Sequence, residues 1–167
     1  LIQNFFHAIQ EGAMEFSIDD GRIEINRNNL GALFADENIR AAAKENGALD
    51  DFLLSENLYN CLISSDAVES VIESAELGRV QVRVLVAEDL PKKVCIIRNG
   101  MVVTDNLSHF GETFARFRMC RDFVAVVVPL DDSGRAFIKR LENPRHDELS
   151  ADRLPSPSDR AAAIPVM

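Results

Sequence analysis

An Asn-Gly pair, Asn99-Gly100, separates two apolar and largely β-branched runs, Val94 to Ile97 and Met101 to Val103. An Asn-Gly pair between β-branched runs is the strongest short-range signal for a β-hairpin, because Asn and Gly tolerate the left-handed backbone conformation of a two-residue hairpin turn better than other residues. The sequence therefore predicts a pair of antiparallel strands here, and the rest of the fold has to be built around it.

Two further segments have the pattern of strands in the same sheet. Apolar residues alternate with other residues from Val80 to Val86, which is typical of a half-buried strand. The run Phe123 to Val128 is almost continuously apolar, which favours a central strand covered on both faces. Asp131 to Gly134 is predicted to be a turn, and Ala136 to Glu142 has the apolar spacing of a helix.

The first half of the chain begins with a helix and a small hairpin. Leu1 to Gln10 places its apolar residues at helical spacing. Residues then alternate from Met14 to Ile18 and again from Ile23 to Ile25, on either side of an Asp-Gly turn, which predicts a β-hairpin.

The middle of the chain is less regular. The polar, alanine-rich segment Asn28 to Leu54 is predicted to form short helices and loops whose structure the sequence does not fix. Ser65-Asp66 is predicted to cap a further short helix that runs through Ile72. We therefore expect an α+β fold in which helices pack on a mixed, mostly antiparallel sheet.

Composition limits the setting in which such a domain works. The 167 residues are 47% hydrophobic, which is enough for a core, and the formal net charge is −9. Because affinity for nucleic acid comes mainly from Lys and Arg, direct binding of nucleic acid is not indicated. The apolar runs are shorter than the roughly 18 residues that cross a bilayer, and no export signal opens the chain, so we expect a cytoplasmic protein without membrane contact.

The ends of the sequence suggest a piece of a larger protein. Leu1 lies inside the first predicted helix, and no initiator Met precedes it. Proline recurs after Asn143 and the apolar periodicity fades. We expect one α+β domain over residues 1–153, followed over 154–167 by a Pro-rich tail or linker to a missing region.

Residues with metal-binding or nucleophilic side chains do not form a recognisable motif. The cysteines and histidines are widely separated: Cys61, Cys95, Cys120, His7, His109 and His146. The cysteines have apolar neighbours and are interpreted as reduced core residues. No CxxC pair, phosphate-cradling glycine motif or GxSxG elbow is present, so the sequence predicts no metal site and no catalytic residue.

Acidic clusters are the remaining candidates for chemistry. Asp19-Asp20, Asp50-Asp51 and Asp131-Asp132 could hold a metal or divide acid and base roles, but each lies at a predicted turn or helix edge, where aspartate is favoured for local bonding. The segment Glu142 to Glu148 combines Arg, His and acidic residues. Its His146 could act as a general base or ligand, although such a residue more often locks a loop to a sheet.

Three short blocks carry a family resemblance: Leu1 to Gly12, Ile97 to Val103 and Leu141 to Asp147. In this order they resemble the region that follows the ATPase module in bacterial GHKL-type ATPases, the superfamily of gyrase B, the ninety-kilodalton heat-shock chaperones, MutL and the MORC proteins. The nearest likeness is to MutL/MORC-like proteins associated with restriction and phage-defence gene sets.

The resemblance implies a transducer domain with the ribosomal protein S-five domain-2-like fold. Such a domain couples ATP binding in a preceding module of the same chain to conformational change or dimer closure, so the parent would bind ATP and Mg and could act as a homodimer. The Asn-bearing helix motif and the Gly-rich lid of the ATP site are not found in the sequence. The fragment is therefore expected to hold no cofactor and not to hydrolyse ATP by itself.

A transducer needs a cation that reaches the γ-phosphate of the bound nucleotide. The candidates for such a sensor in the intact protein are Arg98, Lys92 and Lys93, and Arg98 stands just before the hairpin turn, where the tip could project. The alternative for Arg98 is an exposed charge that protects a sheet edge.

Two function classes stay open beyond a free-standing hydrolase, which is a distant third. The first is the non-catalytic transducer domain of a GHKL-type ATPase. The second is an independent acidic protein–protein interaction module. The upstream coding sequence separates them, because only the first requires the Asn-bearing ATPase motifs there.

Overall fold

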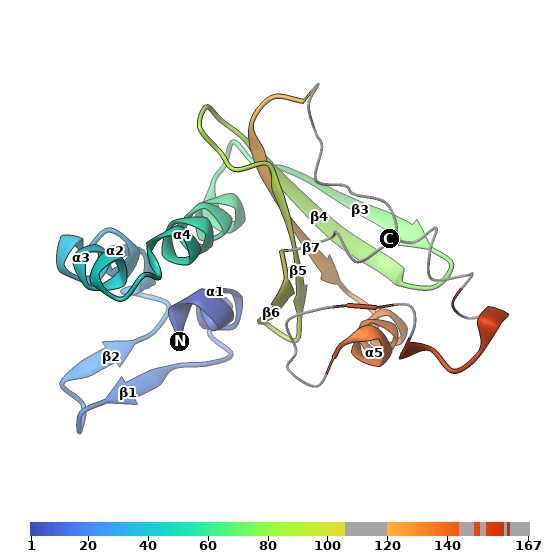
Figure 1. The fold of residues 1–167 in the computed structure, drawn as a ribbon, viewed down its shortest axis with the longest axis horizontal. Coiled ribbons are helices and arrows are strands. Elements are labelled where there is room, and N and C mark those ends of the chain that lie inside the picture. Colours follow the sequence, from blue (N-terminus) through green and yellow to red (C-terminus); the bar gives the residue numbers. More distant parts are fainter. Residues whose placement is uncertain (106–119, 144–148, 151–152, 159, 161–167) are drawn as a thin grey trace.

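The protein is seen in a computed structural model that describes residues 1–105, 120–143, 149–150, 153–158 and 160. It has an α+β fold with a five-stranded mixed sheet, a two-stranded antiparallel sheet and helices packed around them (Figure 1). The expected fold class is confirmed at this level.

The first half of the chain holds most of the helices. In chain order its elements are α1 (Ile2–Gln10), β1 (Phe16–Ile18), β2 (Ile23–Ile25), α2 (Leu30–Phe34), α3 (Glu37–Glu45) and α4 (Leu49–Ile63). The second half forms the large sheet. Its elements are β3 (Val68–Ser74), β4 (Gly78–Val86), β5 (Lys93–Arg98), β6 (Met101–Thr104), β7 (Phe123–Pro129) and α5 (Asp132–Leu141).

The large sheet has the strand order β3-β4-β7-β5-β6. Neighbouring strands are antiparallel except for β5 and β7, which run parallel. β7 is the central strand and buries Val124, Ala125 and Val126, as its apolar sequence predicts. Asn99 and Gly100 both have positive φ, +52° and +78°, so the predicted hairpin between β5 and β6 is also confirmed.

The sheet separates two layers of helices. α1 and α4 lie on one face and α5 lies on the other (Figure 1). The larger core lies under α1 and α4. It includes Phe6, Ile9, Leu58, Cys61, Cys95, Ile97, Val124 and Val126. The smaller core lies under α5 and contains Val103, Ile138, Leu141, Leu149 and Leu154.

The predicted helix from Ser65 to Ile72 is wrong, because these residues form the turn after α4 and most of β3. The Ser64 hydroxyl accepts a hydrogen bond from the Asp66 backbone amide at 3.1 Å, which bonds the turn locally. β-Branched side chains then favour an extended backbone, and β3 pairs with β4 along its whole length.

Two other boundaries differ from the sequence predictions. Asp131 to Gly134 is not a separate turn, because α5 starts at Asp132 and Asp131 is its N-cap residue. Leu154, the first residue of the predicted tail, is fully buried in the smaller core. None of the described helices is long and apolar enough to cross a membrane.

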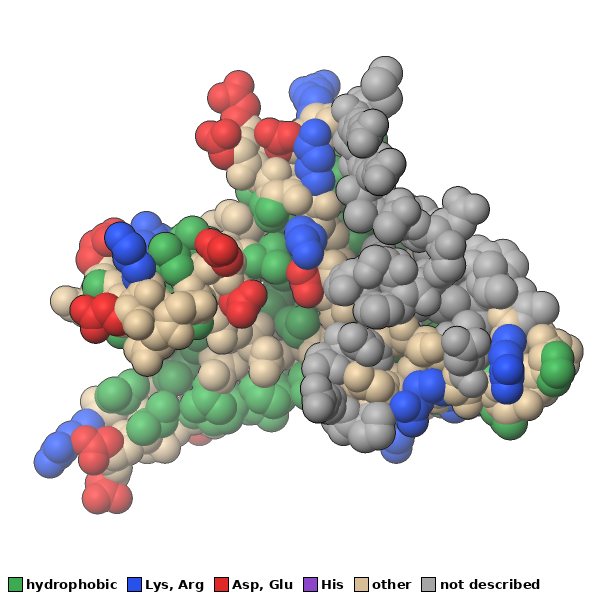
Figure 2. Space-filling view, in the orientation of Figure 1, with side chains coloured by type: hydrophobic (Ala, Val, Ile, Leu, Met, Phe, Trp, Pro, Cys, Tyr) green, Lys and Arg blue, Asp and Glu red, His purple; other side chains and the backbone are tan. Residues whose placement is uncertain are grey.

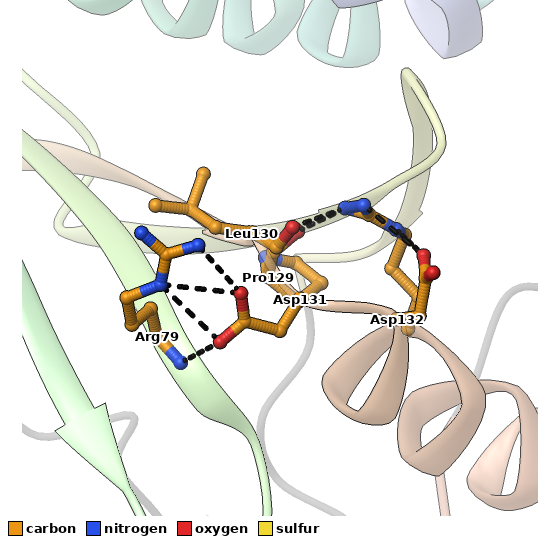
Figure 3. A network of polar contacts seen from close by, with 6 residues as sticks. Arg79, Pro129, Leu130, Asp131 and Asp132 are labelled. Atoms are coloured by element: carbon orange, nitrogen blue, oxygen red, sulfur yellow. Dashed lines mark hydrogen bonds and ion pairs between the residues drawn. The ribbon is translucent and has the colours of Figure 1, made fainter.

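A polar network fixes the start of β4 to the start of α5 (Figure 3). Arg79 donates from its backbone amide and from its guanidinium to the Asp131 carboxylate, each at 2.8 Å. Arg135 donates to the Leu130 carbonyl oxygen at 2.7 Å. These bonds to Arg79 hold the pKa of Asp131 below its ordinary value, so the carboxylate stays charged at neutral pH.

Candidate functional site

β3 is an edge strand: among the described residues, no strand pairs with it on its outer side. All of its residues but the last are exposed, and the exposed fractions of Val68, Val71 and Ile72 are 70%, 52% and 51%. It is seven residues long and contains neither proline nor lysine, and its only charged residues are Glu69 and Glu73. Its register with β4 runs without a bulge, so its outer side offers a regular row of backbone donors and acceptors.

The opposite edge of the same sheet is protected. β6 is only four residues long, and its register with β5 shifts between Ile96 and Ile97. α1 packs against it, and the Ala8 amide donates a hydrogen bond to the Gly100 carbonyl oxygen at 3.1 Å. The two edges therefore differ in length, regularity and cover, and only β3 has the properties of a docking edge.

One face of the β3 edge carries two exposed apolar residues, Val68 and Ile72, with Ser70 between them. In the antiparallel ladder Val68 lies opposite Val84, Ser70 opposite Val82, and Ile72 opposite Val80. Opposed residues in such a ladder share a face, so the valines of β4 extend the apolar surface of β3 inward from the edge.

A hollow of about 540 Å³ adjoins this face at the end of the sheet. Among the described residues it is lined by Val84, Val86, Cys120, Arg121 and Phe123. Val86 is 49% exposed.

The other face of the β3 edge is charged. Glu69 lies opposite Arg83 and Glu73 lies opposite Arg79. Glu69 forms an ion pair with Arg83 and accepts a hydrogen bond from Gln81 at 2.9 Å, and these contacts lower the pKa of its carboxyl. This face of the edge therefore presents two carboxylates on either side of Val71.

A second group of exposed apolar residues lies on the small hairpin and α1. Figure 2 shows hydrophobic side chains gathered along the lower side of the molecule over these elements. The exposed members include Leu1, Met14, Ile18 and Ile23. The strands of this hairpin are only three residues long, so they offer far fewer backbone groups than β3.

Arg98, the first predicted sensor, lies inside the protein. Its guanidinium forms two bonds with the Glu142 carboxylate, one of them between Nη2 and Oε2 at 2.7 Å. The side chains of Arg98 and Glu142 are 11% and 1% exposed. The expectation of an exposed edge charge is therefore wrong, because α5 ends beside the hairpin and brings a carboxylate to the arginine.

The two lysines lie at the other end of β5. Lys92 contacts the Asp122 carboxylate at 3.1 Å, and Lys93 contacts Asp105 at 2.7 Å. Lys93 and Arg98 are the two ends of β5, which at about 3.3 Å per residue places their Cα atoms roughly 16 Å apart. The structure therefore does not bring the three candidate cations together into one phosphate site, and each has an acidic partner in its own chain.

The acidic pairs occupy the structural positions that the sequence suggests. Asp19 and Asp20 lie in the hairpin turn with positive φ, and Asp50 and Asp51 lie in the first turn of α4. Within the described part of the chain, no three acidic, histidine or cysteine side chains are placed to hold a metal ion. His146 and His109 lie outside the described residues.

Comparison with known proteins gives no relative for this chain. No protein-family model matches it, and neither a curated protein nor a solved structure is significantly similar to it.

Proposed function

We propose that this chain is a non-catalytic domain that works by binding protein, and that it does so through the edge formed by β3. The observation that carries the proposal is the contrast between the two edges of the large sheet. β6 is short, interrupted and covered, whereas β3 is long, regular, exposed and partly apolar. An open edge of this kind pairs readily with another strand, so a protein that keeps one uncovered is expected to have a partner for it.

In the version that the family resemblance suggests, the partner is the ATPase module that precedes this domain in the same chain. The domain would then be the transducer of a GHKL-type ATPase, in a restriction or phage-defence system, with the ribosomal protein S-five domain-2-like fold. It would couple binding of ATP and Mg in that module to dimer closure.

One arrangement in the fold favours this version. The described residues of the three sequence blocks that carry the resemblance lie around the β5–β6 hairpin, although the blocks are far apart in the chain. Ala8 of the first block bonds Gly100 of the second, and Arg98 of the second pairs with Glu142 of the third. Arg98 stays a candidate sensor, but to reach a phosphate it would have to leave Glu142.

Site-specific photo-crosslinking in the full-length protein tests the proposal. A photoreactive phenylalanine analogue replaces Ser70 on β3, or Ala41 on the exposed side of α3 as the control position. We expect a discrete adduct from position 70, its loss when Ile72→Lys is added, and no such adduct from position 41. Mass spectrometry of the adduct then distinguishes the preceding module from a separate protein.

Equal adducts from both positions, or none from position 70, would contradict a contact at β3. Sequencing of the upstream gene separates the two versions, because the transducer requires the ATPase motifs there and an independent interaction module does not.

A further inference from the structure

β3 already has one neighbouring strand, and the contacts with that strand reveal the chemistry that β3 accepts. β4 places Arg83 opposite Glu69 and Arg79 opposite Glu73, with Gln81 between them opposite Val71. The inner neighbour of β3 therefore carries two basic side chains four residues apart on one face. On its other face it carries Val80, Val82 and Val84 opposite β3, together with Gly78 at the start of the strand.

A strand added on the outer side of β3 would meet the same side chains on the same faces, because directly opposed residues in a ladder share a face. Glu69 is 42% exposed in its side chain, and an ionised carboxylate accepts more bonds than its contacts with Arg83 and Gln81 use. Glu73 is exposed and lies opposite Arg79, which it influences electrostatically, but within the described part of the chain it forms no ion pair as close as 4.0 Å. Both carboxylates are thus open to a basic side chain from outside.

A second copy of this chain is a poor occupant of the edge. Antiparallel pairing of two β3 strands over their full length is centred on Val71, and it sets Glu69 of each copy opposite Glu73 of the other. Like charges directly opposite each other destabilise a strand pair, and each copy also carries a formal net charge of −9. The edge therefore disfavours self-association and favours a basic strand.

We propose that the protein bound at β3 contributes an extended strand with two Lys or Arg residues four positions apart, and that this strand becomes the sixth strand of the large sheet. The basic side chains meet Glu69 and Glu73, and the apolar side chains of the opposite face meet Val68 and Ile72. This inference rests on the proposed function, whose contact surface it defines chemically.

A short peptide with this pattern is the probe. Acetyl-Lys-Val-Thr-Val-Lys-Val-amide, labelled with a fluorophore, is titrated against the full chain up to about 1 mM, because a single added strand binds weakly. The matched peptide has Glu in place of each Lys. We expect saturable binding of the lysine peptide and binding of the glutamate peptide at least about tenfold weaker, since it would set like charges opposite each other.

Methylation of the peptide's backbone amides distinguishes a peptide that pairs as a strand, through backbone hydrogen bonds, from one that binds through its side chains alone. Alternate residues of a paired strand point their amides at the neighbour. Two versions of the lysine peptide, methylated on one or the other alternate set of amides, should therefore differ in affinity by about tenfold or more. Equal affinity of the two methylated peptides would overturn the sixth-strand geometry.

Charge reversal at Glu73 tests whether this residue pairs with a lysine of the peptide. Glu73→Lys should weaken binding of the lysine peptide by about fivefold and strengthen binding of the glutamate peptide, as the removal and reversal of an exposed ion pair does. Glu45→Lys at the end of α3 makes the same change in net charge away from β3 and should leave both affinities unchanged. Equal effects of the two variants would show that only net charge matters and would overturn the inference.

Different results would contradict the proposed basic partner strand and the proposed protein contact at β3. If the lysine peptide does not bind while the photo-crosslink at position 70 persists, the partner chemistry is wrong and the protein contact at β3 stands. If the crosslink is absent, the proposed function itself fails.

Discussion

At the scale of single residues, burial determines whether a charged side chain forms an internal ion pair or contacts solvent. Arg98 precedes the hairpin turn, where sequence alone suggests an exposed side chain, yet its guanidinium contacts a carboxylate that is 1% exposed. The ion pair raises the pKa of Arg98 and joins the β5–β6 hairpin to the end of α5. A buried ion pair of this kind adds little stability over an apolar pair, but removal of one partner leaves the other charge buried.

Arg98→Ala is therefore expected to lower the free energy of unfolding by about 3 kcal/mol, because the buried Glu142 carboxylate would lose its two bonds to the guanidinium. Urea denaturation of the variant measures this loss. The double variant Arg98→Met with Glu142→Leu should recover most of it. Unchanged stability of Arg98→Ala, together with weaker ATP-dependent dimer closure in the full-length protein, would instead support its role as a nucleotide sensor.

His7 makes stability depend on pH. Burial lowers its pKa below 6.5, and the nearby Glu11 opposes this shift more weakly. Its Nδ1 atom is buried and has no hydrogen-bond partner among the described residues. The unfolded chain thus binds a proton at His7 more readily than the folded chain, so stability is lost as pH falls below 6.5 toward the folded pKa.

We expect the melting temperature to fall between pH 7.5 and pH 5.5, and to fall less in His7→Gln. Thermal melts of both proteins across this range provide the measurement. Parallel pH curves for the two proteins would show that His7 does not contribute.

At the scale of elements, the hairpin between β5 and β6 depends on close approach to α1. Gly100 has φ +78°, and a Cβ atom placed on it would lie 2.5 Å from the Cβ atom of Ala8. Gly47 has a similar φ of +68°, but a Cβ atom there would meet nothing within 4 Å. The two glycines share a left-handed backbone conformation, which would strain any residue with a Cβ atom, and they differ in their surroundings.

Gly47→Ala is expected to cost about 1 kcal/mol of folding free energy, from backbone strain alone. Gly100→Ala should cost at least about 2 kcal/mol more, because α1 or the hairpin must shift to admit the methyl group. Chemical denaturation of the two variants measures the difference. Equal losses would contradict the close contact between α1 and the hairpin.

The elements with a local signal could be predicted from the sequence. Asn99 and Gly100 belong to the residue types that favour the positive φ of their hairpin turn. The run Phe123 to Val128 is apolar, as expected for a strand that is covered on both faces. The sequence predicts a helix in place of β3 because Val68, Val71 and Ile72 have the spacing of a helical face. In an edge strand of which neither face is fully buried, apolar and polar residues do not have to alternate. The short segment that connects β3 to β4, a strand with a clearly alternating sequence, is the feature that could have indicated a hairpin here.

The site depends on contacts that sequence does not display. Glu142 lies 44 residues from Arg98 in the sequence, and the residues around each of them do not predict an ion pair between the two. Likewise, β3 becomes an edge only because β7 pairs on the other side of β4, which is a property of strand order. The sequence supplied the candidate cations, and the topology determined that they lie at opposite ends of a strand.

At the scale of the whole molecule, the sheet has one closed edge and one open edge. The closed edge meets α1, and the open edge carries exposed Val68 and Ile72 on one face and two glutamates on the other. This asymmetry is the basis of our proposal that the domain binds protein at β3. The acidic net charge agrees with a basic partner strand at the open edge.

Hydrogen exchange at β3 in the assembled full-length protein tests this account most directly, with β6 as the internal reference. A paired edge strand exchanges its outward amides slowly, and a free one exchanges them quickly. We predict that the outward amides of β3, which do not face β4, are protected in the assembled protein and lose that protection when Ile72→Lys is introduced, while protection of β6 is unchanged. Rapid exchange of β3 in the assembled protein, equal to that in Ile72→Lys, would contradict the claim that this edge is bound by protein.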